Sequence, residues 1–216
     1  MAVAKETTPE NQRLNQPTID PFANVINVPG RGGEPYARFA ELFRTLQDKV
    51  IVSNPPDSVW DEGAGRIQAA IDLLEPWAAP ERERPAGTRI DLPGRGNPML
   101  IPFIWDEITN DHVRGRATFR QFHLGGNGAA HGGTLPLLFD EVLGRAANTG
   151  FPKVARTAYL KVNYRAIAPL EVELQVDATV DRVEGRKRWA SARLYDDGTL
   201  VADAEGLFVE LRPGQP

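Results

Sequence analysis

The sequence predicts an α+β fold in which an antiparallel sheet accompanies one long helix, with a helical region before it. Three observations support this class. Apolar residues recur at helical spacing in two segments of the first third of the chain and again over residues 134–148. Beyond residue 98, several segments alternate between apolar and polar residues, as strands with one buried face do. Short turns join most of these strands, so hairpins outnumber crossovers and the sheet is expected to be antiparallel.

The N-terminal part is predicted to be a tail followed by two helices. Residues 1–33 are polar and end in PGRGG, which indicates a loosely held tail. Residues 34–97 are expected to form a helical extension and its linker. The first helix carries an apolar stripe at helical spacing: Phe39, Leu42, Phe43, Leu46 and Val50. The second helix repeats this spacing and is expected to be capped by Ser58 and to end before Pro76. A linker rich in proline and glycine follows.

Residues 98–216 are predicted to form one domain with the order two strands, one helix and four strands. The first two strands flank a polar turn at Thr109-Asn110-Asp111. The clearest strand covers residues 170–181, where apolar and polar residues alternate without a break. Turns at Val183-Glu184-Gly185 and Asp196-Asp197-Gly198 are expected to separate the last three strands.

Composition excludes several classes of function. The 216 residues include no cysteine, which removes disulfides and thiolate catalysis. The three histidines, His112, His123 and His131, are too scattered for a metal cluster, so no metal is expected. A net charge of −4 does not favour nucleic-acid binding. No apolar run reaches the ~20 residues that span a bilayer, and the N-terminus lacks the apolar core of a secretory signal. We therefore expect a cytoplasmic protein without a membrane or nucleic-acid partner.

The helix predicted over residues 134–148 is apolar on nearly all sides. One face holds Leu135, Leu138, Phe139, Val142, Leu143 and Ala146. The opposite side holds Leu137, Asp140, Gly144 and Ala147. A helix of this kind is expected to be buried on both sides, against the sheet and against a second surface. Glu141 has Arg145 four residues later, and we expect these two side chains to form an ion pair.

Asp140 has no cation close to it in the sequence. Either a distant strand supplies one, for instance Arg165 or Arg120, or the carboxylate belongs to a functional site. Gly132 and Gly133 precede the same helix. Without side chains they would let a substrate oxygen approach the free N–H groups of the helix start, as in an oxyanion hole; the alternative is an ordinary glycine-rich turn. Asp140 lies about two helical turns from Gly132, roughly 10–12 Å along the axis, so both could address one bound group.

With these residues in place, the chain resembles hotdog-fold acyl-CoA thioesterases, most closely the phenylacetate-degradation type and related proteins of the thioesterase superfamily. The resemblance covers about residues 98–212. Its most specific element is HGG followed by an acid nine positions after the histidine, here His131 and Asp140. A second element is VNYRAIAPLEVELQVDATVDRVEGRKRW, which is similar to the family's NYxRP-type stretch and the hairpin after it.

The resemblance implies a sheet wrapped around one central helix and protomers that pair as a dimer or a dimer of dimers, with sites at the interface. It implies hydrolysis of an acyl-CoA thioester, in fatty acid metabolism, with no cofactor beyond the coenzyme A of the substrate. The Gly132 amide, with or without Gly133, would polarise the carbonyl group. Asp140 would be the general base for water or the attacking carboxylate, and the sequence leaves both open.

Further site residues follow from the same resemblance. In a related branch of the family, a threonine from the other protomer positions the attacking water, and Thr157 lies near that position. Its spacing from Asp140 is one residue longer than in that branch. The alternative is that Thr157 is only a residue at the start of a strand. His131 is expected to hold its loop through backbone bonds. Some relatives carry Asn or Gln where this chain has Gly125, and Asn127 or His123 could substitute. Cations at the 183–185 turn could bind the phosphates of coenzyme A: Arg182, Arg186 and Lys187.

Two other functions compete with hydrolysis. Hotdog dehydratases carry either a catalytic histidine followed by a proline-rich loop before the helix acid, or a histidine a few residues after the acid. This chain has neither arrangement around Asp140. The stronger alternative is a non-catalytic hotdog module that binds acyl-CoA or a protein, which the helical extension favours. A DNA-binding role of that extension is disfavoured because it has no basic stripe. A lid over the acyl tunnel or an added dimer contact is the simpler interpretation.

Overall fold

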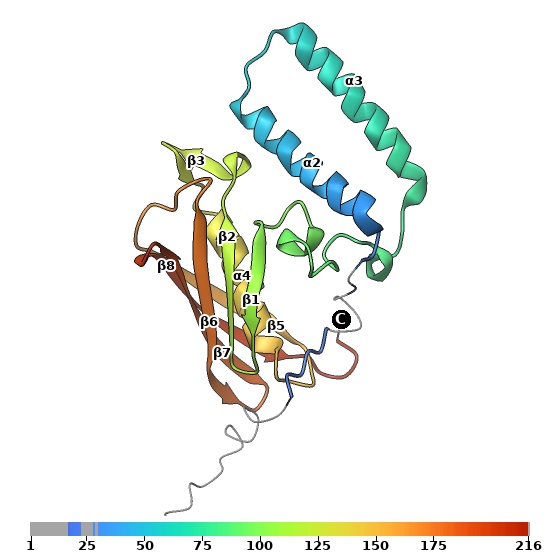
Figure 1. Ribbon diagram of the computed structural model, residues 1–216. Coiled ribbons are helices and arrows are strands. Elements are labelled where there is room, and N and C mark those ends of the chain that lie inside the picture. The colour runs from blue at the N-terminus through green and yellow to red at the C-terminus, as the bar shows by residue number, and fades with distance from the viewer. Residues whose placement is uncertain (1–16, 23–27, 29, 216) are drawn as a thin grey trace, which may run out of the picture.

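The computed structural model describes residues 17–22, 28 and 30–215. It consists of a pair of helices beside a curved sheet that surrounds one helix (Figure 1). The helices are α2 (Gly33–Val52), α3 (Asp57–Leu74) and α4 (Thr134–Asn148). The sheet consists of β1 (Phe103–Ile108), β2 (His112–Thr118), β5 (Ala155–Tyr164), β6 (Glu173–Glu184), β7 (Lys187–Asp196) and β8 (Thr199–Glu210). Short elements are η1 (Glu75–Trp77), η2 (Glu81–Glu83), η3 (Pro93–Gly96), η4 (Gln121–His123), β3 (Leu124–Gly126) and β4 (Ala129–Ala130).

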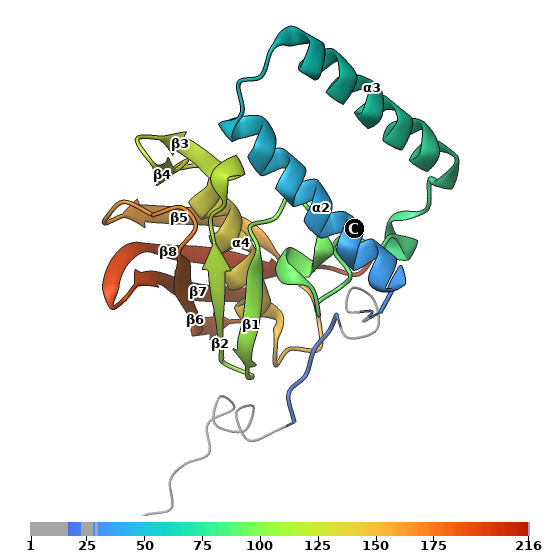
Figure 2. The same cartoon turned by 45° about the horizontal axis from the view of Figure 1, so that its top comes forward.

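The six-stranded sheet has the order β1-β2-β6-β7-β8-β5, and every neighbouring pair is antiparallel. It curves around α4, which lies in its concave face (Figure 2). The apolar face predicted for α4 is buried in this curve, with side chains at most 2% exposed: Leu135, Leu138, Phe139, Val142, Leu143 and Ala146. Strand residues such as Leu174 and Val176 complete the core. The α+β prediction and the order of strands and helix are therefore confirmed.

Helix α4 has the predicted bounds because local chemistry fixes both ends. Pro136 lies in its first turn, where its missing N–H removes no helical bond. Asn148 ends the helix, and its buried side chain donates to the Ala155 carbonyl at 3.2 Å and accepts from the Ala155 N–H at 2.7 Å. This amide therefore attaches the end of α4 to the start of β5.

Several local predictions were wrong. Ser58 is not the N-cap of α3, because the helix already begins at Asp57 after Pro56. Strand β6 begins at Glu173 instead of residue 170, because Glu171 has a left-handed backbone with φ of 59° that interrupts the strand. The small β3–β4 hairpin was not predicted. The turns after β1 and β7 lie where the sequence placed them, and the turn after β6 lies at residues 185–186.

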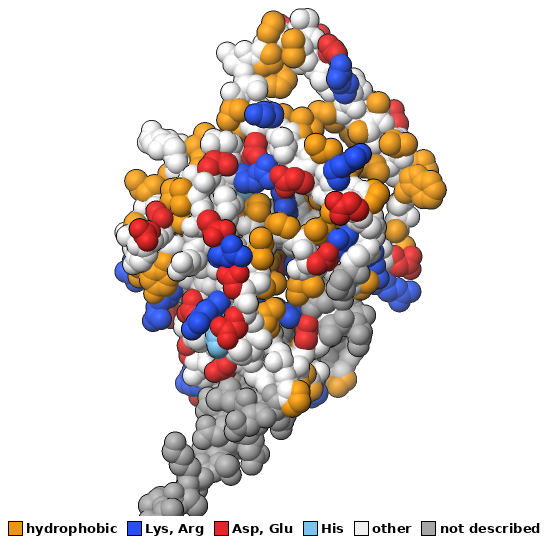
Figure 3. Space-filling model, viewed as in Figure 1, with side chains coloured by type: hydrophobic (Ala, Val, Ile, Leu, Met, Phe, Trp, Pro, Cys, Tyr) orange, Lys and Arg blue, Asp and Glu red, His pale blue; other side chains and the backbone are white. Residues whose placement is uncertain are grey.

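Helix α2 contacts the rest of the molecule through a face that its apolar stripe did not predict. Its buried residues are Ala40 and Arg44, and Arg44 donates to the carbonyls of Pro93 and Asn97 at 3.2 and 2.6 Å. The stripe residue Leu42 is 60% exposed. Helix α3 has no buried residue. In the space-filling view, apolar side chains accordingly gather over these two helices (Figure 3).

Part of the predicted tail is packed against the body. Gly150 N–H donates to the Ile19 carbonyl at 2.7 Å, and Asp20 forms an ion pair with Arg145 at 3.0 Å. The prediction of a loosely held tail is therefore wrong for residues 17–22, whereas residues 1–16, 23–27 and 29 lie outside the described part. Within the described ranges, no helix is both long and apolar enough to cross a bilayer.

Candidate active site on helix α4

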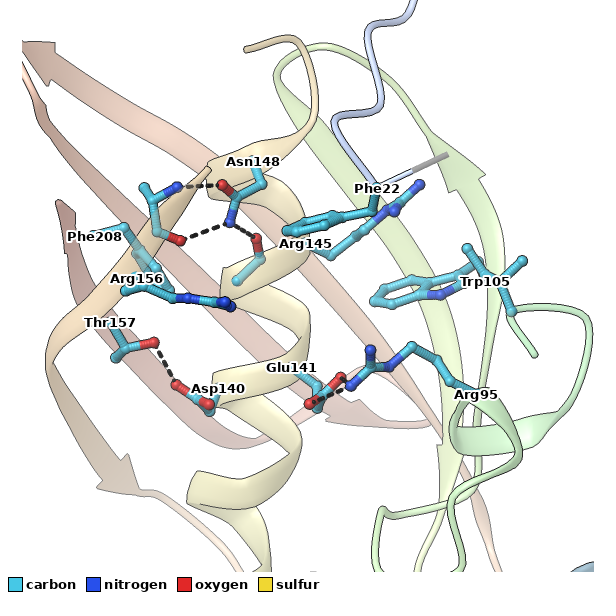
Figure 4. A pocket seen from close by; sticks show the side chains of 13 residues that line it. Phe22, Arg95, Trp105, Asp140, Glu141, Arg145, Asn148, Arg156, Thr157 and Phe208 are labelled. Atoms are coloured by element: carbon cyan, nitrogen blue, oxygen red, sulfur yellow. Dashed lines mark hydrogen bonds and ion pairs between the residues drawn. The ribbon is translucent and has the colours of Figure 1, made fainter. Parts of the chain in front are cut away.

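A cleft of about 150 Å³ opens over the side of α4 that the sheet leaves uncovered (Figure 4). Asp140, Gly144 and Asn148 follow one another at four-residue spacing, so they form a single stripe along the helix and the floor of the cleft. Residues 155–157 of β5 and Phe208 of β8 lie on one side. Trp105 of β1, with residues 90 and 95 and Phe22, lies on the other side.

Asp140 is exposed in the single chain, contrary to the expectation that both sides of α4 are covered. Its Oδ1 accepts a hydrogen bond from the Thr157 hydroxyl at 2.8 Å, and this contact joins α4 to β5 within one chain. The two arginines considered as its partners lie elsewhere. Arg120 pairs with Asp48 at 2.6 Å, and Arg165 pairs with Asp203. Among the described residues, no cation forms an ion pair with the Asp140 carboxylate.

Glu141 is the more buried of the two adjacent acids, which reverses the expectation from the sequence. Its side chain is 20% exposed and pairs with Arg95 at 2.8 Å, whereas Arg145 pairs with Asp20. Burial raises the pKa of the Glu141 carboxyl, and the Arg95 charge opposes that rise. The predicted Glu141–Arg145 pair was wrong because the linker before the domain brings a second arginine to the helix.

Arg156 lines the cleft beside Thr157, and sequence reasoning missed it. Consecutive strand residues normally face opposite sides of a sheet. The register of β5 against β8 is regular from Ala155 to Thr157 and shifts only between Thr157 and Tyr159, so Arg156 itself lies in a regular part of the strand. Figure 4 shows the Arg156 side chain directed across α4. Alternation alone would place Arg156 on the face opposite to Thr157, so the sequence pattern contains no signal for its position at the cleft.

The HGG segment lies at the start of α4, outside the lining of the cleft. Gly133 N–H donates to the His131 Nδ1 at 3.0 Å, so His131 contacts backbone, as its loop-holding interpretation requires. The Gly132 carbonyl accepts from the Tyr164 hydroxyl at 2.8 Å. No acceptor within the described ranges bonds to the Gly132 N–H. Of the two amides considered as oxyanion donors, only that of Gly132 is therefore open.

The loop before HGG does not reach Asp140. A side chain at Gly125 would place its Cβ 2.6 Å from the Cα of His131, so this close approach of β3 and β4 excludes Asn or Gln there. Asn127 is an exposed turn residue with φ of 50°. His123 is buried, its Nδ1 accepts from the Arg120 N–H at 2.8 Å, and burial lowers its pKa to about 4. Neither residue lines the cleft.

The cations proposed for coenzyme A separate into two groups. Arg186 lines a second cleft together with Arg156, Thr157 and Arg212, next to the first. Arg182 instead stacks on the Trp189 ring at 3.8 Å and pairs with Glu184. Lys187 is exposed at the start of β7 and lines neither cleft. Arg188 is buried and donates to the Ala147 carbonyl at 2.8 Å, so it belongs to the core.

Comparison with known proteins places this site in a family. The thioesterase superfamily profile matches residues 127–202, which include HGG and Asp140. A Pseudomonas aeruginosa protein named "Putative esterase PA0474" is 36% identical over 112 residues, which are 51% of this chain and 84% of that protein. The chain belongs to the thioesterase superfamily.

Two further relatives extend this assignment. Acyl-coenzyme A thioesterase THEM4 of Mus musculus is 34% identical over 91 residues, 41% of this chain, and the match spans only 39% of that protein's length. The crystal structure of a thioesterase superfamily protein, 26% identical, superposes with a TM-score of 0.72 over 86% of this chain and all of that chain. The hotdog fold is thus confirmed. An 86% match is too large for residues 98–216 alone, so the superposition includes part of the helical extension.

Proposed function

We propose that this protein hydrolyses an acyl-CoA thioester to a free acid and coenzyme A. The observation that carries the proposal is the Thr157–Asp140 hydrogen bond at the floor of a cleft on the central helix. A carboxylate oriented by a hydroxyl group can hold a water molecule beside a bound carbonyl group. The name of the THEM4 relatives supports the acyl-CoA substrate.

The reaction needs a base and a donor for the developing negative charge. Water attacks the thioester carbonyl carbon, and its proton passes to the Asp140 carboxylate. The carbonyl oxygen becomes negative, and an open Gly132 N–H donates to it. Gly132 of the same chain lies about two helical turns from Asp140, so in this proposal the second protomer of the dimer supplies that N–H. The C–S bond then breaks, and the coenzyme A thiolate takes up the proton. Alternatively, Asp140 attacks directly to form an anhydride that water opens. In both routes the only co-reactant is water.

Arg186 and Arg156 are proposed to bind the phosphates of coenzyme A. Both line the second cleft, which shares Thr157 with the cleft over α4. A substrate whose thioester lies at Asp140 can therefore continue past Thr157 toward these cations. The guanidinium groups suit phosphate because each presents several donors in a fixed geometry. Arg182 and Lys187, which line neither cleft, are expected to contribute less.

A homodimer is proposed as the active form. Strand β5 is one edge of the sheet, and its outer side has no pairing strand in the described chain. The exposed side of α4 lies between this edge and β1, so a second protomer paired along β5 would cover Asp140. Light scattering tests the mass of the particle in solution. A monomer with full hydrolytic activity would contradict this part of the proposal.

The decisive experiment replaces the proposed base by its uncharged analogue. Asp140→Asn keeps an oxygen that accepts from Thr157, so the fold is expected to stay intact while kcat falls about 10²–10⁴-fold. The measurement is release of free thiol from a series of acyl-CoA esters, with thermal unfolding as the check on folding. Asp61→Asn on α3, an exposed aspartate far from the cleft, is the matched control and is expected to hydrolyse like the wild type.

The same experiment separates hydrolysis from binding without catalysis. If Asp140→Asn is as fast as the wild type, the assignment of the base is wrong. If the wild type hydrolyses none of the esters and still binds them in calorimetry, the protein is an acyl-CoA-binding module.

A further inference from the structure

Gly144 lies in the interior of α4, and no contact within the described residues requires a glycine at this position. A glycine there costs about 1 kcal/mol relative to alanine. Its φ is not positive, so the backbone does not require glycine. A Cβ added at this position would meet only the Phe208 ring, at 3.7 Å, which is an ordinary van der Waals contact. Neither conformation nor packing among the described residues therefore explains the missing side chain.

The position of Gly144 suggests a different reason. It lies four residues after Asp140 and four before Asn148, so it is the middle of the stripe that floors the cleft. A side chain at this point would project into the cleft between the proposed base and the far end. The missing side chain thus keeps open the space directly behind the reacting carbon of a bound thioester.

The far end of this space is closed by ordered polar contacts. Asn148 is held by its two bonds to Ala155. Arg145 is held by Asp20 at 3.0 Å. From Asp140 to Asn148 the helix rises about 12 Å, which sets the length of the space. Moving either polar group outward would break bonds within the chain, so the end of the cleft is fixed.

The side walls limit the width. Trp105 and Ile90 face the helix on one side and Phe208 lies on the other. Beside Trp105 the Arg95–Glu141 pair closes the wall with a charged contact of 2.8 Å. Trp105, Ile90 and Arg95 all lie outside residues 127–202, the part that the superfamily profile matches. These walls are therefore built by parts of the chain that the family signature does not include.

We propose that Gly144 determines which acyl groups this protein accepts, and that the acyl group lies over Gly144 with Asn148 at its end. This inference rests on the proposed thioesterase function. The cleft volume of about 150 Å³ equals that of an apolar cavity in another protein that holds benzene. The proposed substrate class is therefore a compact acyl group, a short alkyl chain or a single ring, which the protein should hydrolyse in preference to long-chain acyl groups.

The test compares substrate selectivity in the full chain. The wild type, Gly144→Ala, Gly144→Val and the control Gly65→Ala are assayed with acetyl-, butyryl-, hexanoyl-, benzoyl- and palmitoyl-CoA. Gly65 is also a helix-interior glycine, but it lies on exposed α3, and a Cβ there meets nothing within 4 Å. Both alanine variants are expected to unfold at a slightly higher temperature, because each removes a helical glycine.

The expected result is a change in the ratio of kcat/KM for hexanoyl-CoA to that for acetyl-CoA. One methylene group changes such ratios by about 10–200-fold in an apolar pocket. The cleft also has charged walls, so Gly144→Val is expected to lower the ratio about tenfold, at the low end of this range. Gly144→Ala should lower it less, and Gly65→Ala should leave it unchanged. A glycine that only shapes the helix would change all substrates alike.

Two outcomes would overturn the inference: an unchanged ratio in both Gly144 variants, or a wild type that prefers palmitoyl-CoA to hexanoyl-CoA. A wild type that hydrolyses no ester would refute the proposed function instead. In that case calorimetry measures the ratio of the binding affinity for hexanoyl-CoA to that for acetyl-CoA. An unchanged binding ratio in Gly144→Val would then overturn the selectivity role as well.

Discussion

Helices α4 and α3 have similar apolar periodicity and opposite surroundings. The apolar face of α4 lies inside the curved sheet, with Leu138 at 1% exposure. Helix α3 has no buried residue, and Leu74, which belongs to its apolar stripe, is 51% exposed. Apolar spacing therefore predicts that a segment is helical, but the strands available around it decide whether its apolar side is buried. The candidate site lies on α4, the helix whose apolar face is buried in the sheet.

The largest expected effect tests the buried side of this comparison. Leu138→Ala removes a side chain that is enclosed by the sheet, and the cavity it leaves should lower the free energy of unfolding by about 2–5 kcal/mol. Chemical denaturation monitored by circular dichroism measures this change. A loss below 1 kcal/mol would mean that α4 is less firmly packed than the structure indicates.

An intermediate effect is expected where α2 meets the domain. His123 lies beside Arg120, which pairs with Asp48 of α2. Its pKa of about 4 in the folded chain is below the ordinary value of 6.5, because burial disfavours the charged ring. The neutral ring therefore stabilises the fold fully above pH 6.5, and this contribution is lost as the pH falls toward 4.

With allowance for solvent screening, His123 should contribute about 2 kcal/mol to the pH dependence between pH 6.5 and 4. Unfolding of the wild type and of His123→Gln is compared over this range. Glutamine cannot take up a proton, so the variant should lose less stability on acidification. Equal slopes for the two proteins would show that His123 titrates normally in the folded chain.

The smallest effect is expected on α3, where a leucine is replaced by alanine as in Leu138→Ala on α4. Leu74→Ala removes an exposed side chain of the apolar stripe and keeps a good helix former, so the free energy of unfolding should change by at most about 0.5 kcal/mol. The measurement is the same denaturation curve. A loss above 1 kcal/mol would show that this side of α3 is covered in solution, and the contrast between the two helices would then disappear.

Local chemistry made much of the fold predictable. The bounds of α4 and the order of the strands follow from periodicity, Pro136 and the turn residues, all of which act over a few positions. The contacts of the site do not. Glu141 pairs with Arg95, 46 positions away, instead of the neighbouring Arg145, because the linker passes over the helix. Arg156 lines the cleft, although strand alternation would place it on the face opposite to Thr157.

Of the residues predicted for the candidate site, Asp140, Thr157 and Arg186 line the two neighbouring clefts. Asp140 was named from its place on the helix and Thr157 from the resemblance, and the two form a hydrogen bond at the cleft. His131 and Gly132 lie outside the lining of the cleft. The exposure of Asp140 could not be predicted, because it depends on where the sheet ends and not on the helix itself. Asn127 was chosen for its amide, but it lies in an exposed turn and does not line the cleft. Long-range geometry decided each of these differences.

The close contact between Gly125 and His131 limits how this site can be redesigned. The Cβ of any new residue at 125 would sit 2.6 Å from a backbone atom that cannot rotate away. An engineer who wished to graft the amide side chain of other family members onto this scaffold would first have to separate β3 from β4. A single substitution at Gly125 would displace the HGG loop, so the whole β3–β4 hairpin would have to be redesigned before an amide side chain could be added there.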